Sequence, residues 1–319
     1  MTEDFDNGPR RTGLMLVTAV MLGAFLFSTV GYRLLRDKMK KPAPPVDTTA
    51  DSAAFTRIVS LAPSTTETLY ALGLGDRIVG VTDFCNYPPE ARDKTRVGAL
   101  LRPGYERIIE LKPDLVLALP EYVKGKDDLL RLGLNIEMVN NKSVADVLDC
   151  ISSVGRICGV AESAKLLRDQ TVNRLSTIRQ KSAAAGRRPR VLAAIGRTVG
   201  QRGLAEVYVC GAGSFHDELI GLAGGANAVE LDDYPMLSAE GIMRIDPDVI
   251  IDLIPGPGDD AAAETYGADW KALPSLSAVR NDRVYVLGGD HVLIPGPRFV
   301  QVVEDLAELL HGAGEGTDE

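Results

Sequence analysis

Short apolar segments alternate with amphipathic ones along most of the chain. Four segments have the aliphatic and β-branched composition of buried strands: RIVSL at 57–61, RIVGV at 77–81, LVLAL at 115–119 and IEMV at 136–139. Between the first two lies STTETLYALGLG, which is typical of a helix with Ser64 as its N-cap, Glu67 at the third position and a glycine at its end. Strands that alternate with helices predict a largely parallel α/β layer.

The middle of the chain is helical. Residues 143–158 and 162–185 both have helical patterns, and the second carries one apolar stripe at intervals of three and four, formed by Ala164, Leu167, Thr171, Leu175 and Ile178. GRRPR at 186–190 ends this helix, and RVLAAIG at 190–196 opens a second α/β set. A helix of about 24 residues is roughly 36 Å long at 1.5 Å per residue, which is enough to join two lobes.

The second α/β set repeats the first. STTETLYALGLGDRIVGVTDF at 64–84 aligns without gaps with SFHDELIGLAGGANAVELDDY at 214–234, an offset of 150. Further on, Glu106 corresponds to Glu240, and Lys-Pro-Asp at 112–114 to Asp-Pro-Asp at 246–248, at an offset of 134. The predicted fold is therefore α/β, with two related lobes, each a mainly parallel sheet flanked by helices, joined by one long rigid helix.

An uncharged apolar run, LMLVTAVMLGAFLFSTVGY, occupies 14–32 and is long enough to cross a bilayer as a helix. The small residues at 50–54 lie about twenty residues beyond it, which is too far for ordinary signal-peptide cleavage. Cys85 is the first cysteine, so no lipidation site follows the run. These features favour an uncleaved membrane anchor over a cleaved signal peptide, with a twin-arginine export signal at Arg10-Arg11 as a further alternative.

The flanks of this run leave its orientation open. Two basic residues precede it and five follow it, so the positive-inside rule alone places the body in the cytoplasm. The stretch KKPAPPVDTTADSAA then reads as a semi-stiff spacer. The predicted organisation is a tail at 1–13, an anchor at 14–32, a basic then proline-rich linker at 33–54, an N-terminal lobe at 55–160, a connecting helix at 161–186, a C-terminal lobe at 187–312 and a flexible tail at 313–319.

The charge balance excludes one class of partner. The chain of 319 residues has a net charge of −9. Residues 1–41 hold seven basic and four acidic residues, a balance of +3, so the remainder holds 28 and 40, a balance of −12. Binding to a phosphate backbone requires a basic face, and this body is acidic, so no nucleic-acid partner is expected.

The repeated glutamates, Glu106 and Glu240, allow two interpretations. An acidic residue in the first turn of a helix is stabilised by the helix dipole whatever its function. One such residue at the equivalent place in each lobe also makes a pair suited to docking on a two-fold symmetric partner through arginine forks.

The segments RIVSLAPSTTETLYALGLGDRIVGVTDFCNYPPEA and YERIIELKPDLVLA resemble the substrate-binding proteins of ABC importers for metal chelates and corrinoids, in the class whose lobes are joined by one helix. The resemblance covers roughly 55–310. It implies a periplasmic or external ligand-binding body, a ligand in the cleft between the lobes, and docking of Glu106 and Glu240 to arginines of a permease dimer. No enzymatic activity and no cofactor of its own are implied, and any metal arrives inside the ligand.

The resemblance also names cleft residues. Phe84, Tyr234 and Asp290 stand where the cobalamin-binding branch has cleft aromatics and an acidic residue. Leu100, Leu119 and Ile195 stand where that branch has larger aromatics, so a more aliphatic cleft is expected. Arg197 and Arg202, in IGRTVGQRG, are candidates for contacts to an anionic chelate or to propionates, with exposure to solvent as the alternative for both. The predicted ligand is a corrinoid, with a ferric siderophore or haem as the alternative; for haem, His291 is the candidate iron ligand, against a purely structural role.

An enzyme is the competing interpretation. VYVCGAGSFHDELIGLAGG has a Gly-x-Gly turn after a strand, with Glu230 about 19 residues after Gly211, as in dinucleotide-binding folds. His216 occupies the third glycine position, however, and the same residues are explained as the second copy of the repeat. The three histidines form no zinc-like cluster. Cys85, Cys150, Cys158 and Cys210 are even in number, but their spacing assigns no disulfide.

Overall fold

The computed structural model describes residues 55–121, 130, 131, 133–199, 204, 206–255 and 260–312. The predicted tail, anchor and linker at 1–54, the candidate Arg202 and the predicted tail at 313–319 lie outside these residues. Among the helices that the structure describes, none has the length and apolar character needed to span a bilayer.

The N-terminal lobe is built on a wholly parallel sheet in the order β3-β2-β1-β6-β7. Its strands are β1 (Ile58–Ser60), β2 (Ile78–Val81), β3 (Thr95–Arg96), β6 (Leu115–Ala118) and β7 (Ile136–Met138). A small hairpin, β4 (Gly98–Ala99) with β5 (Arg102–Pro103), stands beside it. The α-helices are α2 (Pro63–Ala71) and α3 (Tyr105–Glu110), with 3-10 turns η1 (Gly75–Arg77) and η2 (Pro89–Asp93). The four predicted strands are all present.

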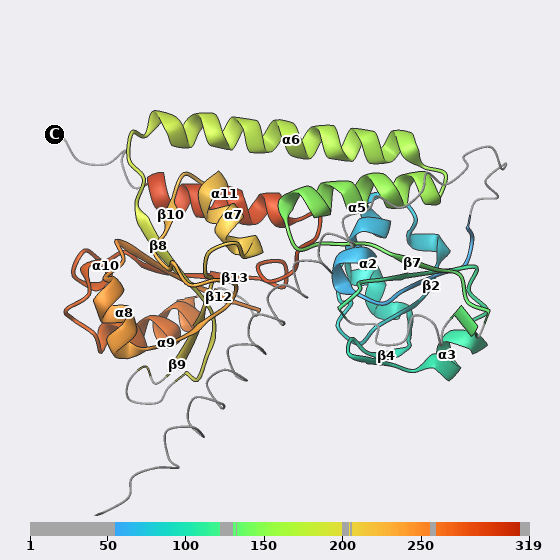
Figure 1. The fold of residues 1–319 in the computed structure, drawn as a ribbon, viewed down its shortest axis with the longest axis horizontal. Coiled ribbons are helices and arrows are strands. Elements are labelled where there is room, and N and C mark those ends of the chain that lie inside the picture. Colours follow the sequence, from blue (N-terminus) through green and yellow to red (C-terminus); the bar gives the residue numbers. More distant parts are fainter. Residues whose placement is uncertain are drawn as a thin grey trace, which may run out of the picture. The chain divides into compact units, whose positions relative to one another are not determined.

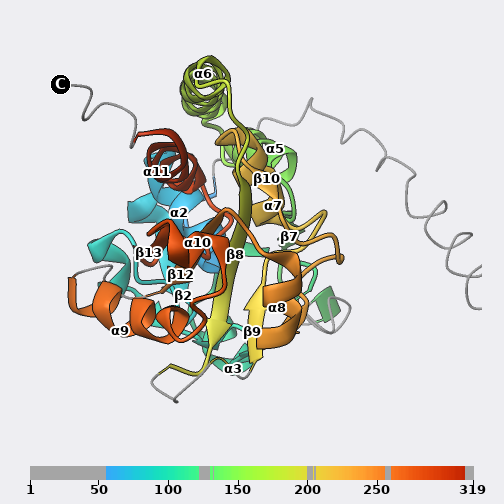
Figure 2. The same ribbon diagram turned by 90° about the vertical axis from the view of Figure 1, so that its left-hand side faces the viewer.

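Two long helices follow. Helix α5 (Val144–Ile157) begins with a capping box between Ser143 and Asp146, and α6 (Ala161–Ala184) is the predicted connecting helix of 24 residues. Figure 1 shows α6 extending over both lobes, and the end-on view in Figure 2 shows it above α5 and α11 (Phe299–His311). Four members of its predicted apolar stripe are buried, and the fifth, Leu167, is partly buried.

The C-terminal lobe has a mixed sheet in the order β11-β9-β8-β12-β13, with β10 also paired to β8. Its strands are β8 (Arg190–Arg197), β9 (Glu206–Val209), β10 (Ala226–Asn227), β11 (Met236–Ser238), β12 (Val249–Ile254) and β13 (Val284–Gly288). Strands β8, β10, β12 and β13 are parallel to one another, whereas β9 pairs antiparallel with both of its neighbours, β8 and β11. The helices are α7 (Phe215–Leu222), α8 (Ala239–Ile245), α9 (Asp260–Lys271), α10 (Ser277–Arg280) and α11. The predicted two-lobed α/β fold with parallel sheets is confirmed, with an antiparallel edge on the second lobe.

The sequence repeat corresponds to a repeated set of contacts at the base of each lobe. Arg57 precedes β1, and its guanidinium donates to the carbonyls of Leu111 and Lys112 at the end of α3. Arg190 starts β8, and its guanidinium donates to the carbonyls of Ile245 and Asp246 at the end of α8. In each lobe one arginine therefore satisfies the free carbonyls at a helix end and ties that helix to the first strand.

The Lys-Pro-Asp and Asp-Pro-Asp segments complete these contacts. The Asp114 carboxylate accepts the backbone N–H of Arg57 at 2.9 Å, and the Asp248 carboxylate accepts that of Arg190 at 2.8 Å. Lys112 and Asp246 turn the chain with φ of 47° and 44°, the left-handed conformation that commonly ends a helix. The structure thus assigns the first residue and the final aspartate of both segments a structural role.

The predicted cap of the first helix is wrong. Helix α2 begins at Pro63, because proline has no N–H to lose and its fixed φ suits the first helical position. Ser64 therefore lies inside the helix, and its hydroxyl accepts a hydrogen bond from Nδ2 of Asn141 at 3.0 Å. In the second copy Ser214 does cap α7, accepting the N–H of Asp217.

Candidate functional site

A cleft lies where the carboxyl ends of the parallel strands of the two lobes meet, the usual ligand position in parallel α/β sheets. Residues that follow β1, β6, β12 and β13 line a first pocket with a volume of about 330 Å³. A second pocket of about 530 Å³ adjoins it, since both are lined by Asn141, Leu293 and Pro295. The cleft is thus walled by both lobes.

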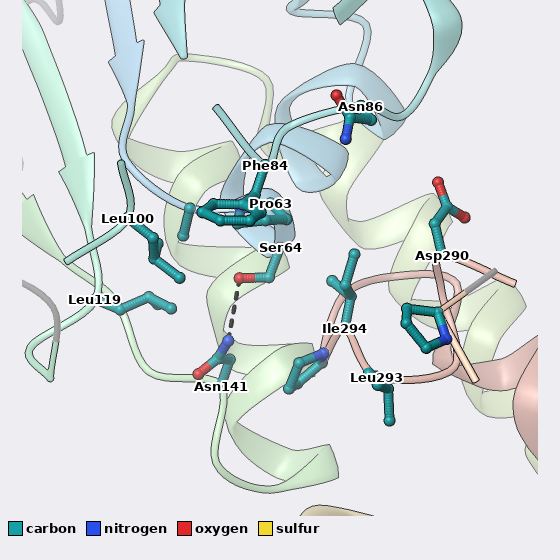
Figure 3. A pocket seen from close by; sticks show the side chains of 13 residues that line it. Pro63, Ser64, Phe84, Asn86, Leu100, Leu119, Asn141, Asp290, Leu293 and Ile294 are labelled. Atoms are coloured by element: carbon teal, nitrogen blue, oxygen red, sulfur yellow. Dashed lines mark hydrogen bonds between the residues drawn. The ribbon is translucent and has the colours of Figure 1, made fainter. Parts of the chain in front are cut away.

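The first pocket is mainly apolar. Phe84, Leu100 and Leu119 line it from the N-terminal lobe, and Leu293 and Ile294 from the C-terminal lobe (Figure 3). Polar groups are few and include the hydrogen-bonded pair of Ser64 and Asn141, the amide of Asn86 and the carboxylate of Asp290. Phe84 is 59% exposed, so its ring is available to a ligand.

The second pocket holds an ordered polar pair. Nε2 of His216 lies 2.8 Å from the carbonyl of Val292, so this nitrogen carries the proton and donates. Nδ1 is then an acceptor, and the hydroxyl of Tyr234, 3.2 Å away, donates to it. Burial lowers the pKa of His216 and raises that of Tyr234 to about 12. Both groups are therefore neutral near pH 7, and the histidine fixes the direction of the phenol.

Six of the seven predicted ligand-binding residues line these two pockets. Phe84, Leu100, Leu119 and Asp290 belong to the first pocket, and Ile195 and Tyr234 to the second. The pair of aromatics equated by the sequence repeat, Phe84 and Tyr234, thus lies in the cleft, one on each lobe.

Arg197 does not reach the cleft, and its predicted contact with a ligand is wrong. Its side chain is 1% exposed, with Nε 2.9 Å from Asp252 and Nη1 2.6 Å from Asp269. Nη2 donates to the carbonyl of Tyr266, and the guanidinium stacks near the ring of Trp270. The pairing of β8 with β9 shifts register around Ile195, so side chains on either side of the shift do not alternate regularly. Arg197 therefore points into the lobe interior.

His291 is also placed outside the pocket linings. Its Nε2 lies 3.9 Å from the carboxylate of Asp305. Within the described residues no group of three or more histidine, cysteine or acidic side chains is arranged to hold a metal ion.

The four cysteines are buried and free. Burial raises the pKa of each thiol, to about 12 for Cys150 and about 11 for Cys158. Such thiols are unreactive, and none of the four lines the two pockets described above.

The two repeated glutamates lie at the start of equivalent helices. Glu106 is in the first turn of α3 and Glu240 in the first turn of α8, and both are exposed. Figure 1 shows these helices on the same side of the protein, opposite α6. Hydrogen bonds from its own backbone N–H and from Ser238 lower the pKa of Glu240.

Several cleft residues were missed by the sequence reasoning. Leu293, Ile294 and Pro295 belong to the glycine- and proline-rich segment GGDHVLIPGPR that supplied Asp290, and this composition is the signal that could have found them. The contacts of Asn141 with Ser64 and of Arg298 with Glu67 join residues 77 and 231 positions apart and leave no local signal.

Comparisons with known proteins identify the family to which this chain belongs. The sequence profile of the family described as periplasmic binding protein matches residues 58–291. A vitamin B12-binding protein of Vibrio cholerae is 30% identical over 301 residues, covering 93% of this chain and 98% of the relative. An uncharacterized ABC transporter substrate-binding lipoprotein of Bacillus subtilis is 30% identical over 261 residues, 80% of each chain.

Solved structures agree. The crystal structure of a periplasmic vitamin B12-binding protein of Vibrio cholerae has a TM-score of 0.69 at 29% identity and covers 82% of this chain and 99% of that chain. That of a periplasmic heme-binding protein of Pseudomonas aeruginosa has a TM-score of 0.72 at 23% identity, covers 83% and 95%, and bears on the fold alone. The matched profile, the shared two-lobed fold and the cleft at the strand ends lead to one conclusion: this chain belongs to the periplasmic binding protein family, as a class III substrate-binding protein of an ABC transporter and not an enzyme.

Proposed function

We propose that this protein captures a corrinoid, cobalamin-like ligand in the cleft between its lobes and delivers it to an ABC permease. The observation that carries the proposal is the wall of the first pocket, where Phe84, Leu100, Leu119 and Ile294 supply apolar surface beside a few polar groups, of which only the Asp290 carboxylate is charged. Large flat macrocycles bind well to apolar walls with a small number of polar contacts. The relative from Vibrio cholerae, named as a vitamin B12-binding protein, supports the same ligand class.

The charges of the cleft favour a ligand without carboxylates. Among the lining residues that the structure describes, Asp290, Glu121 and Asp233 are acidic and Lys142 is basic. Haem carries two carboxylates, and many ferric chelates are anions, so both need basic partners. The rim of cobalamin consists mostly of neutral amides, which the asparagines and hydroxyls of the cleft can bind. Arg197 lies outside the cleft and supplies no positive charge to it, which further favours cobalamin over haem or an anionic ferric chelate.

Titration of the purified full chain with cobalamin and, separately, with haemin tests the ligand assignment. We expect cobalamin to bind with a dissociation constant in the micromolar range or below, and haemin to bind at least about tenfold more weakly. Absorbance and calorimetry measure both affinities. Tighter binding of haemin would refute the electrostatic argument. Binding of neither would refute the ligand class.

Docking to the permease is assigned to Glu106 and Glu240. Both are exposed on the same side of the protein, and each is followed three residues later by an exposed apolar side chain, Ile109 or Met243. Residues three apart on a helix are neighbours on its surface, so each lobe presents a carboxylate beside an apolar contact. Two such sites related by the sequence repeat suit a two-fold symmetric permease.

The double variant Glu106→Ala/Glu240→Ala tests this assignment. Uptake, or ATPase stimulation of the permease in vesicles, is expected to fall by about tenfold or more, while cobalamin affinity stays within twofold of the wild type. The matched control is Glu90→Ala/Glu230→Ala, which removes one exposed glutamate from each lobe outside α3 and α8. An equal loss in the control, or a large loss of ligand affinity, contradicts the docking role.

Tethering to the membrane through residues 14–32 remains part of the proposal, with the binding lobes facing the periplasm or exterior. The Bacillus subtilis relative is named as a lipoprotein, which supports a tethered state for this class of protein. N-terminal sequencing of the protein recovered from cell membranes tests whether residues 14–32 are retained in the mature chain. A mature chain that begins downstream of Ala50 contradicts the uncleaved anchor.

A further inference from the structure

A buried ion pair joins the two lobes behind the first pocket. Arg298 precedes α11 in the C-terminal lobe and reaches Glu67 of α2 in the N-terminal lobe, with Nε 3.0 Å from Oε2 and Nη2 2.6 Å from Oε1. The side chain of Glu67 is 3% exposed and that of Arg298 is 11% exposed. Two parallel bonds between a guanidinium and a carboxylate fix orientation as well as distance.

The remaining guanidinium nitrogen connects this pair to the pocket. Nη1 of Arg298 lies 2.7 Å from Oδ1 of Asp290, whose side chain is 42% exposed and lines the first pocket. Figure 3 shows Asp290 across the pocket from Leu100 and Leu119. Glu67 is outside the lining of both pockets. The chain Glu67–Arg298–Asp290 thus runs from the interior of one lobe to the pocket wall of the other.

Two further residues are fitted to this arrangement. The ring of Tyr87, from the N-terminal lobe, lies 3.5 Å from the central carbon of the Arg298 guanidinium and covers its face. Gly296 leaves room for the pair, because a Cβ at this position would lie 3.0 Å from Oε2 of Glu67. The guanidinium is therefore held from three directions, two of them in the opposite lobe.

Adhesion of the lobes does not by itself require these charges. Burial is the main influence on Glu67 and raises its pKa even though Arg298 opposes the change. Apolar side chains of similar volume join two surfaces at least as well as a buried ion pair does. The charges instead fix the orientation of the three side chains. Of Glu67, Arg298 and Asp290, it is Asp290 that lines the pocket.

We propose that Arg298 is a positioning residue for ligand binding, which holds the Asp290 carboxylate in place against the ligand while Glu67 holds Arg298 from the other lobe. This inference rests on the proposed function, since it requires that the cleft binds the ligand. The N-terminal lobe, through Glu67, then fixes the orientation of the Asp290 carboxylate on the C-terminal lobe. Glu67 therefore contributes to affinity without contacting the ligand.

A double-mutant cycle with Glu67→Gln and Asp290→Asn tests the inference, with cobalamin titrated into the purified full chain. Each single variant is expected to weaken binding by about tenfold, the size of a lost hydrogen bond to a charged group. The double variant should be no weaker than Asp290→Asn alone, because Glu67 acts through Asp290. Arg298→Lys, which keeps the charge and loses the fork, should resemble Glu67→Gln and serves if that variant does not fold.

The matched control is Glu218→Gln. Glu218 makes another hydrogen bond between the lobes, accepting the backbone N–H of Val144 at 2.8 Å, and is not part of the Glu67–Arg298–Asp290 set. Its affinity for cobalamin should stay within twofold of the wild type, whereas a general loosening of the lobes would weaken both variants.

Three results overturn the inference: a Glu67→Gln affinity within twofold of the wild type, full additivity with Asp290→Asn, or an equal loss in Glu218→Gln. These outcomes differ from failure of the proposed function, in which the wild-type chain itself binds neither cobalamin nor haemin. In that case the inference fails with it. If the wild type binds haemin instead, the same cycle is run with haemin and judged by the same criteria.

Discussion

Substitution of Arg197 by methionine separates a structural arginine from a ligand-binding one. The side chain is 1% exposed and makes ion pairs with Asp252 at 2.9 Å and Asp269 at 2.6 Å, besides its bond to the Tyr266 carbonyl. Methionine has a similar length and fills much of the same space, so the main loss is the charge and its hydrogen bonds. We expect the C-terminal lobe to be destabilised and the cleft to be unaffected.

The expected loss of stability depends on the acidic side chains that are left without Arg197. Removing one partner of a buried ion pair costs about 3–5 kcal/mol, because the other charge is left without compensation. Asp252, whose side chain is 1% exposed, keeps the donor Nε1 of Trp270 at 2.9 Å, which places the expected loss near the lower end of that range. Net stabilities of domains are about 5–15 kcal/mol, so the variant stays folded but melts clearly earlier.

The loss should depend on pH in a defined direction. Burial already raises the pKa of Asp252, and removing the nearby cation raises it further. A carboxyl whose folded pKa lies above its unfolded value of about 3.9 destabilises the fold once it ionises. The stability deficit of Arg197→Met is therefore small in acid and grows as pH rises from about 4 through the folded pKa of Asp252.

Denaturant unfolding followed by far-UV circular dichroism measures the deficit, and calorimetry measures cobalamin affinity. The single tryptophan, Trp270, is fully buried beside Arg197 and gives a second signal by fluorescence. The matched control is Arg174→Met, which breaks an exposed fork to Glu304 and should cost at most about 1 kcal/mol. Unchanged stability combined with a tenfold loss of affinity would refute the placement of Arg197.

Three further predictions concern the cleft and the core. Phe84→Ala should weaken cobalamin binding several-fold with little loss of stability, because the ring is 59% exposed; calorimetry and urea unfolding measure the two effects, and unchanged binding means that another wall holds the ligand. Burial lowers the pKa of His216, so its stabilising contribution is complete above about pH 6.5 and is lost as pH falls through the folded pKa. Each unit by which the pKa is lowered corresponds to about 1.4 kcal/mol of stability. His216→Gln should therefore make the free energy of unfolding less dependent on pH between about pH 7.5 and 5.5. The four thiols should resist an alkylating reagent in the native protein and react in urea, and rapid native labelling seen by mass spectrometry contradicts their burial.

The lobes and their connection were predictable because they depend on local periodicity. The strands that contain Ile58 and Leu115 have continuous apolar runs, and the stripe from Ala164 to Ile178 recurs at helical intervals. The repeat added the relation between the lobes, and the structure shows its physical basis in the contacts of Arg57 and Arg190 with the ends of α3 and α8.

The candidate site was predictable where residues follow a strand and not where they depend on distant partners. Phe84 and Leu119 follow strands whose carboxyl ends define the cleft, so their position is a consequence of topology. Arg197 was misplaced because a register shift between β8 and β9 has no sequence signature. Glu67 was assigned to a helix cap, since nothing local indicates a partner 231 residues away.

The single helical connection has a consequence for how proteins of this shape diversify. Every strand of the first sheet precedes α6 and every strand of the second follows it, so each lobe is one uninterrupted segment of the chain. A crossover between related genes within 161–184 therefore exchanges a whole lobe, with its wall of the cleft and its helix α3 or α8, without cutting a sheet. The hybrid needs compatible partners where the two lobes touch, among them Glu67 with Arg298 and Glu218 with the start of α5. Recombination can in this way combine one lobe's wall of the cleft with a new opposite wall in one step.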